Sequence, residues 1–326
     1  MHENIHAVKN GGLIIRQFGK LYLADYESLH DDVSTNPIEI VDPVIKSDAK
    51  LVGSANGLEV HNAAREPYGM RPTFCHKYFG LCIGGFGYDH VSDDYKFVKL
   101  GMCGNRFAEI IVTVYSVRTN SWTHIQNARL SRDIYLNDQW GRFAGGALYW
   151  KAIDFGKKTE IIVGFDLGLG QFREVAWPAD RNFWNLYGFG DNLYTLKYSK
   201  SPVDVFQMND YSAEKPWSKA FTVMGKNVFD YGFKPLMYSE GLGEVLILVD
   251  NKRPVWYHLE SKRIKEVRIN PIPRLTSDAE FYTESLFQFP KDRQPQNLLR
   301  GIRGTKQQQN KRETTAQVAN SRGKNS

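Results

Sequence analysis

Three aspartates lie within six residues of the segment GGFGYDHVSDDYKFVKL, which runs from Gly84 to Leu100. Asp89, Asp93 and Asp94 could hold a cation, because carboxylate oxygens are ligands that Ca²⁺ prefers. A calcium loop follows a pattern such as Asp-x-Asp-x-Asp-Gly, which this segment lacks. Aspartate also favours turns, since its side chain hydrogen-bonds the nearby backbone. We therefore expect IGGFGYD to form a strand, HVSD a turn and DYKFVKL the return strand.

The first of these two strands has a marked alternation of residue size. Successive side chains of a strand point to opposite faces, so Phe86 and Tyr88 lie on one face and Gly85 and Gly87 on the other. We expect the aromatic side chains to pack and the glycines to allow the close approach of a neighbouring strand.

Other chemically active residues match no known catalytic or metal-binding motif. Cys75, His76, Cys82 and His90 fall within 16 residues, but their spacing, Cys-His-x5-Cys-x7-His, matches no common zinc motif. The segment FDLGLGQF (165–172) has the glycines of a phosphate loop, yet the following REVAWP is typical of a strand and not of a helix. No Ser-His-Asp set, nucleophile elbow or paired-carboxylate motif stands out, although distant loops could still assemble a site. We expect no catalytic residue, metal or cofactor.

The positive charge of the chain is concentrated in residues 291–326. The sequence has 42 Lys/Arg and 36 Asp/Glu, a net charge of +6. Residues 291–326 hold nine of the basic and two of the acidic side chains, which gives +7; the other 33 basic and 34 acidic side chains give −1. This tail has no aromatic residue and is predicted to be disordered. A nucleic-acid interaction would rest on the tail alone, so none is expected of the body.

Composition and cysteine usage indicate an intracellular protein. Hydrophobic residues make up 42% of the chain and aromatic residues 13%, enough for a sizeable core. No apolar run approaches the roughly 18 residues of a membrane-spanning helix, and no signal-peptide core precedes the body. Cys75, Cys82 and Cys103 form neither a paired framework nor a Cys-x-x-Cys motif. We expect a reducing compartment, the cytoplasm or nucleus, and no membrane partner.

A strand–turn–strand unit recurs along the body. VYSVRTNSWTHI begins at Val114 and GFDLGLGQFREV at Gly164; looser copies are VDVFQMNDYSAEKPWSKAFTV and VWYHLESKRIKEV, and a first copy, LYLADYESL, begins at Leu21. The large residues in matching places are 50, 45 and 47 residues apart, and are Trp122, Phe172, Trp217 and Ile264. No stretch shows sustained helical periodicity. A period of about 45–50 residues in an all-β chain is typical of a four-stranded propeller blade.

These repeats predict an all-β, propeller-like domain over residues 21–290, with about six four-stranded repeats. Residues 1–20 are then a lead-in and residues 291–326 the basic tail. One repeat is irregular, because residues 59–79, EVHNAAREPYGMRPTFCHKYF, lack a clean strand–turn–strand pattern. A missing strand would expose sheet edges, so we expect reduced solubility.

Seven segments, in order, resemble hallmark segments of plant F-box proteins with an F-box-associated interaction domain, some of which are called F-box/kelch-repeat proteins. They are LVGSANGL (51–58), GFGYDHVSDDYKFVKL (85–100), VYSVRTNSWTHI, GGALYWKA, VGFDLGLGQFREV, PWSKAFTV and LFQF. Their order and spacing fit along most of the stretch from Leu21 to Phe289.

The resemblance implies a kelch-type propeller that binds a protein target. In such proteins it is the substrate-recognition part of an SCF-type (Skp1–cullin–F-box) ubiquitin ligase and makes no bond itself. An N-terminal F-box normally binds a Skp1-type adaptor; nothing here resembles it, so we expect a truncated product, a competitor for the target or an inactive remnant. The family's LWNP-type strand after NGL is also missing, at the irregular segment.

Two tryptophans outside the repeat pattern are candidates for partner contact. Trp140 in YLNDQWGRF and Trp184 in DRNFWNLYG lie between the predicted strands, and exposed loop aromatics are common interface anchors. Otherwise they belong to the core, as expected of Trp122, Trp150 and Trp217 in their repeat positions. The alternative function is a carbohydrate-binding or carbohydrate-active propeller, which would need two carboxylates within about 5–10 Å in a central pocket.

Overall fold

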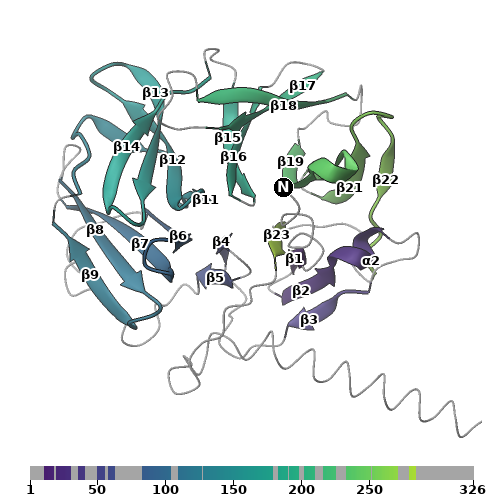
Figure 1. The fold of residues 1–326 in the computed structure, drawn as a ribbon, viewed down its shortest axis with the longest axis horizontal. Helices are drawn as coiled ribbons and strands as arrows, with labels where there is room; N and C mark the ends of the chain where they lie inside the picture. The colour runs from purple at the N-terminus through teal and green to yellow at the C-terminus, as the bar shows by residue number, and fades with distance from the viewer. Residues whose placement is uncertain are drawn as a thin grey trace, which may run out of the picture.

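The part of the chain that the structure describes forms six antiparallel sheets arranged in a ring (Figure 1). The structure is a computed structural model. It describes residues 11–17, 20–30, 36–40, 50–55, 58–62, 83–103, 109–126, 128–178, 183–189, 191–197, 202–209, 216–224, 233–250, 252–270 and 279–283.

Five of these sheets have four or five strands. The first contains β23 (Ala279–Thr283), β1 (Gly11–Gln17), β2 (Lys20–Asp25) and β3 (Ile38–Ile40). The second contains β6 (Ile83–Asp89), β7 (Asp94–Cys103), β8 (Glu109–Ser116) and β9 (Ser121–Ile125). The third contains β10 (Ile134–Leu136), β11 (Arg142–Ala144), β12 (Ala147–Asp154), β13 (Thr159–Asp166) and β14 (Gln171–Val175). The fourth contains β15 (Phe183–Phe189), β16 (Asn192–Lys197), β17 (Val203–Met208) and β18 (Trp217–Val223). The fifth contains β19 (Phe233–Ser239), β20 (Glu244–Val249), β21 (Arg253–His258) and β22 (Ile264–Glu266).

The sixth sheet consists of β4 (Lys50–Ala55) and β5 (Leu58–Asn62) among the described residues. The predicted all-β propeller is thus confirmed, with five blades of four or five strands and, where the sixth of about six predicted repeats was expected, a sheet of two described strands. Most of the irregular segment, from residue 63 onward, lies outside the described residues, so its blade stays a prediction. The predicted basic tail, residues 291–326, also lies outside them.

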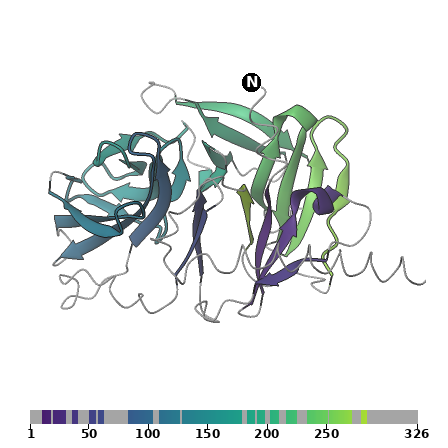
Figure 2. The same cartoon turned by 60° about the horizontal axis from the view of Figure 1, so that its bottom comes forward.

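The ring closes through strands from opposite ends of the chain. β23 pairs antiparallel with β1, with Leu13 opposite Phe281, and β1 continues into the hairpin with β2. In Figure 2 the yellow-green β23 stands beside the purple β1. β1 falls within the first 20 residues, which were expected to be a lead-in, and it takes part in the same sheet. Sharing one sheet between distant segments joins the last blade to the first.

Helix is a minor component of the described chain, as predicted. The first repeat copy differs from the others, because β2 is followed by the five-residue helix α2 (Tyr26–His30) and not directly by a return strand. The indole N–H of Trp256 on β21 donates to the carbonyl oxygen of Leu29 at 2.9 Å, which ties this helix to the neighbouring blade. A second helix, η1 (Glu240–Leu242), has three residues, and no described helix could cross a membrane.

Adjacent blades pack closely at the glycines of β6, as the sequence predicted. Phe86 is buried on one face of this strand. On the other face, a Cβ added to Gly85 would lie 2.9 Å from the side chain of Leu148 on β12. A Cβ at Gly87 would lie 2.4 Å from the ring of Phe143 on β11. Both distances are below van der Waals contact, so these positions leave no room for a side chain.

We predict that Gly87→Ala destabilises the propeller by about 1–3 kcal/mol, because the new methyl group overpacks the blade interface. Urea unfolding followed by tryptophan fluorescence would measure the change. Thr123→Ala, at an exposed position on β9, is the control and should change stability by less than about 0.5 kcal/mol. Equal stabilities of Gly87→Ala and the unmodified chain would contradict the close packing of these blades.

Candidate protein-interaction surface

Asp89 ends β6, and its buried carboxylate organises the turn that follows. The backbone N–H of Val91 donates to Oδ1 at 2.9 Å, while the Ser92 hydroxyl and the Lys96 ammonium donate to Oδ2, the ammonium at 2.6 Å. Burial is the largest influence on the pKa of Asp89 and raises it, but the hydrogen bonds from Lys96, Ser92 and Val91 together lower that pKa below its ordinary value. Asp89 is therefore an ionised structural group at neutral pH.

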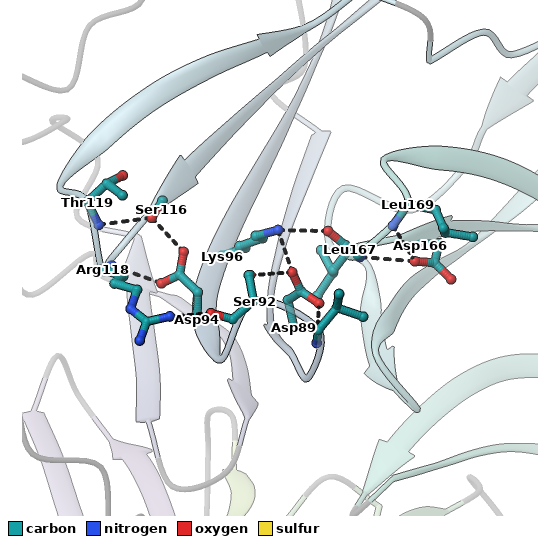
Figure 3. A network of polar contacts seen from close by, with 12 residues as sticks. Asp89, Ser92, Asp94, Lys96, Ser116, Arg118, Thr119, Asp166, Leu167 and Leu169 are labelled. Carbon is teal, nitrogen blue, oxygen red and sulfur yellow. Dashed lines mark hydrogen bonds and ion pairs between the residues drawn. The ribbon is translucent and has the colours of Figure 1, made fainter.

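Asp94 begins β7 and connects two turns of the same blade. Its carboxylate accepts a hydrogen bond from the Ser116 hydroxyl and another from the backbone N–H of Arg118, the latter at 2.8 Å. The Arg118 side chain in turn donates to the carbonyl oxygen of Ser92. The Ser116 hydroxyl oxygen also accepts from the N–H of Thr119 at 3.0 Å. The β6–β7 and β8–β9 turns are therefore held together by one buried carboxylate (Figure 3).

Asp93 completes the turn. It has a left-handed backbone with φ of 50°, a conformation that aspartate tolerates better than most residues. The Tyr88 hydroxyl donates to its carboxylate, and this hydrogen bond raises the pKa of Tyr88 to about 12. All three aspartates thus serve the hairpin between β6 and β7, and the predicted strand–turn–strand assignment is confirmed.

A clamp between blades joins this hairpin to the next sheet. Lys96 donates a second hydrogen bond, at 2.9 Å, to the carbonyl oxygen of Leu167 in the β13–β14 turn. That turn is organised by Asp166, whose Oδ1 accepts the N–H groups of Gly168 and Leu169 at 3.0 and 2.8 Å. Figure 3 shows Lys96 between Asp89 and Leu167. Three turns from two blades are therefore held in one relative position.

The clamped turns present an apolar pair to solvent. Val91 is 85% exposed and Leu169 is 72% exposed, the highest values among the large hydrophobic residues of the described chain. The two turns touch, because a Cβ added to Gly168 would lie 3.0 Å from a methyl group of Val91. We call this pair and its exposed polar neighbours the turn surface. Its members are Val91, Leu169, His90, Asp93 and Arg118.

Exposed apolar side chains surrounded by polar ones are typical of protein-interaction sites. Sequence reasoning found both turns but missed the apolar pair. Both segments, DHVSD and DLGLG, place an apolar residue two or three positions after a turn-forming aspartate. An apolar side chain at the tip of a hairpin has no core to enter. This position in the sequence could therefore have predicted the exposed pair.

The predicted contact residues Trp140 and Trp184 lie elsewhere. Trp140 is partly buried where β6 meets the next sheet: Gly84 donates to the carbonyl oxygen of Gln139 at 2.9 Å, and Gly141 donates to that of Gly84 at 2.8 Å. The Trp140 ring lies 6.5 Å from that of Phe97. The backbone of Trp184 belongs to β15, while its side chain lies outside the described residues. A partner contact by either residue stays a prediction.

Of the possible zinc ligands, His90 lies in the β6–β7 turn, where its ring packs edge-on against that of Tyr88 with centroids 4.8 Å apart. Cys75, His76 and Cys82 fall outside the described residues. Within the described ranges, no group of three or more His, Cys, Asp or Glu side chains could hold a metal ion.

Comparison with known proteins gives consistent matches. Residues 58–292 match the family model described as an F-box associated beta propeller domain. F-box protein CPR1 of Arabidopsis thaliana is 30% identical, over 88% of this chain and 79% of its own length. Two further Arabidopsis thaliana proteins, an F-box/kelch-repeat protein and an F-box protein, are 28% and 25% identical. Those two matches cover 48% and 60% of this chain, and 43% and 54% of the relatives' lengths.

We predict that Asp89→Asn destabilises the chain at pH 7 by about 1–3 kcal/mol, since the amide cannot accept all the hydrogen bonds that the carboxylate accepts. The pKa of Asp89 is lowered by folding, so its stabilising effect is present above the ordinary value of 3.8 and is lost as the pH falls through the lower folded value. Urea unfolding of both proteins between pH 7 and pH 3 should show the difference shrinking in acid. A difference independent of pH would contradict this role.

Proposed function

Because the chain belongs to the family of F-box-associated β-propeller domains, we propose that it binds a protein target through its turn surface. Propellers of this family are typical of substrate recognition by F-box proteins in SCF-type ubiquitin ligases. In a protein that also carries an F-box, the F-box would bind a Skp1-type adaptor and the propeller would present the target for ubiquitination. Such a complex would work in the cytoplasm or nucleus.

The observation that carries this proposal is the exposure of Val91 and Leu169 on preorganised turns. Hydrogen bonds to the buried Asp89 and to Asp166 hold the backbone N–H groups of both residues. Little conformational freedom is then lost when a partner covers the pair, which favours binding. The exposed charges of Asp93 and Arg118 beside the pair can select the partner by electrostatic complementarity.

The role is recognition and not catalysis. Asp89 and Asp94 are buried, and their carboxylates accept hydrogen bonds that stabilise turns. A glycosidase needs two carboxylates that face a substrate, one to donate a proton and one to act on the sugar. The described contacts of these aspartates therefore support structural roles and do not favour the carbohydrate-active alternative.

We predict that Val91→Asp combined with Leu169→Asp weakens target binding at least about tenfold, because it places two charges where an apolar contact forms. Proteins captured from plant extract by the unmodified chain would be identified by mass spectrometry, and each candidate would then be tested as a purified protein by calorimetry. Thermal melting followed by circular dichroism should be unchanged, since both positions are exposed.

The matched control for this double variant is Phe155→Ser. Phe155 is also an exposed apolar residue, but it lies in the β12–β13 turn, at the end of the sheet opposite the β13–β14 turn. If the affinity for the target falls equally in the double variant and in Phe155→Ser, the assignment of the turn surface is contradicted. It is also contradicted if the affinity falls in neither variant.

Fusion of the chain behind an F-box would test the ligase role separately. In a reconstituted SCF reaction, the fusion should ubiquitinate the purified target, and the double variant should not. Ubiquitination that does not depend on Val91 and Leu169 would contradict target presentation by this surface.

A further inference from the structure

Three charged side chains from strands of three blades meet one another. Arg142 lies on β11, Lys234 on β19 and Glu280 on β23. Each of these strands pairs with a single described strand, and Figure 1 shows all three on the inner side of the ring. We call these residues the axial triad.

Within the axial triad, Glu280 lies closer to Lys234 than to Arg142. Lys234 Nζ lies 2.6 Å from Glu280 Oε1 and also donates to the carbonyl oxygen of Ala279 at 2.9 Å. Arg142 Nη1 lies 3.6 Å from the same Oε1, which is beyond hydrogen-bond distance. Lys234 therefore neutralises Glu280, and Arg142 is held near the carboxylate without a hydrogen bond to it.

Basic residues outnumber acidic residues on the inner strands that the structure describes. In β4, β6, β10, β11, β15, β19 and β23, the charged residues are Lys50, the axial triad and Asp89. Asp89 is already paired with Lys96. Two cations and one carboxylate give the axial triad a net charge of +1. The Arg142 side chain is 37% exposed, so it is accessible.

We propose that Arg142 binds a carboxylate group of the protein target, and that this contact selects targets with an acidic residue or a free C-terminus. The inference rests on the proposed function, which supplies the target. A guanidinium presents a planar fork of N–H donors that matches a carboxylate through two parallel hydrogen bonds. Glu280 shows that a carboxylate is stable beside this guanidinium, and no described residue accepts a hydrogen bond from the fork of Arg142.

The experiment uses acetate as the probe on the full chain. Saturation-transfer NMR would follow the acetate methyl signal during a titration at constant ionic strength, adjusted with chloride. The unmodified chain should bind acetate saturably, and Arg142→Gln should weaken this binding at least about fivefold. Arg132→Gln is the matched control, since Arg132 is an exposed arginine in the turn before β10, and it should bind acetate as the unmodified chain does.

Two further variants make the test specific. Glu280→Gln removes the competing carboxylate and should strengthen acetate binding about fivefold. Arg142→Lys keeps the charge but cannot offer two parallel donors, so binding should fall at least about threefold. Circular dichroism would show whether each variant folds. If Arg142→Gln does not fold, Arg142→Lys replaces it as the test variant.

Two capped peptides would identify the source of the carboxylate. One carries an internal glutamate and an amidated C-terminus, and the other carries only glycines and a free C-terminus. Binding of either peptide that depends on Arg142 would support the inference and name the source. Binding by neither peptide, equal acetate affinities of Arg142→Gln and Arg132→Gln, or weaker binding by Glu280→Gln would each overturn it.

The outcomes also separate this inference from the proposed function. Suppose that acetate binding depends on Arg142, while the affinity of the target does not change in the Val91→Asp, Leu169→Asp variant. This result would support carboxylate binding by Arg142 and overturn the turn surface as the docking site. Suppose instead that the affinity of the target depends on Val91 and Leu169 but is unchanged in Arg142→Gln. This result would support the proposed function and overturn carboxylate binding by Arg142.

Discussion

The pairing of β1 with β23 brings the start and the end of the described chain into one sheet. Each blade buries its faces against its neighbours, so a ring of blades is stable only when the last blade meets the first. In this chain the closing sheet takes its strands from both ends, and helix α2 fastens it to the β19–β22 blade through the hydrogen bond from Trp256 to Leu29. An open ring would expose the apolar faces of two blades and a row of unpaired backbone groups. The position of every inner strand, and so of Arg142, Lys234 and Glu280, depends on this closure.

Buried charge has a second, local role in the blades. Asp89 and Asp94 are almost fully buried carboxylates, which are costly to desolvate unless they are paired and hydrogen-bonded. Here each accepts hydrogen bonds from a turn, and Asp89 also pairs with Lys96. The contacts that offset the desolvation cost of these aspartates also hold the backbone of the turns rigid. The turn surface is therefore a result of how the hairpins are stabilised, and not a separate addition to the fold.

The sequence predicted best what depends on local pattern. The hairpin around Asp89, the glycine face of β6 and the repeated strand–turn–strand unit all follow from alternation and turn chemistry, which act over a few residues. The helix after β2 was not predicted, because its tie to Trp256 joins residues far apart in the chain. The contact of Arg142 with Glu280 has the same origin, since it forms only when the ring closes. The exposure of Val91 and Leu169 was not predicted, because turn chemistry locates the aspartates but does not show which apolar side chains at the tips stay in solvent.

The clamp between the two blades has a consequence for how the surface can change over generations. Lys96 binds the backbone carbonyl oxygen of Leu167, whose side chain is buried in the core, so this residue anchors the turn from within. Position 169 is held through its N–H group, while its side chain extends into solvent. Mutation can therefore alter the chemistry of the exposed turn while the blades keep their register, and loops with this freedom are where new specificities arise. A duplicated copy of such a propeller could acquire a different target by substitutions at the turn tips, with its architecture inherited intact.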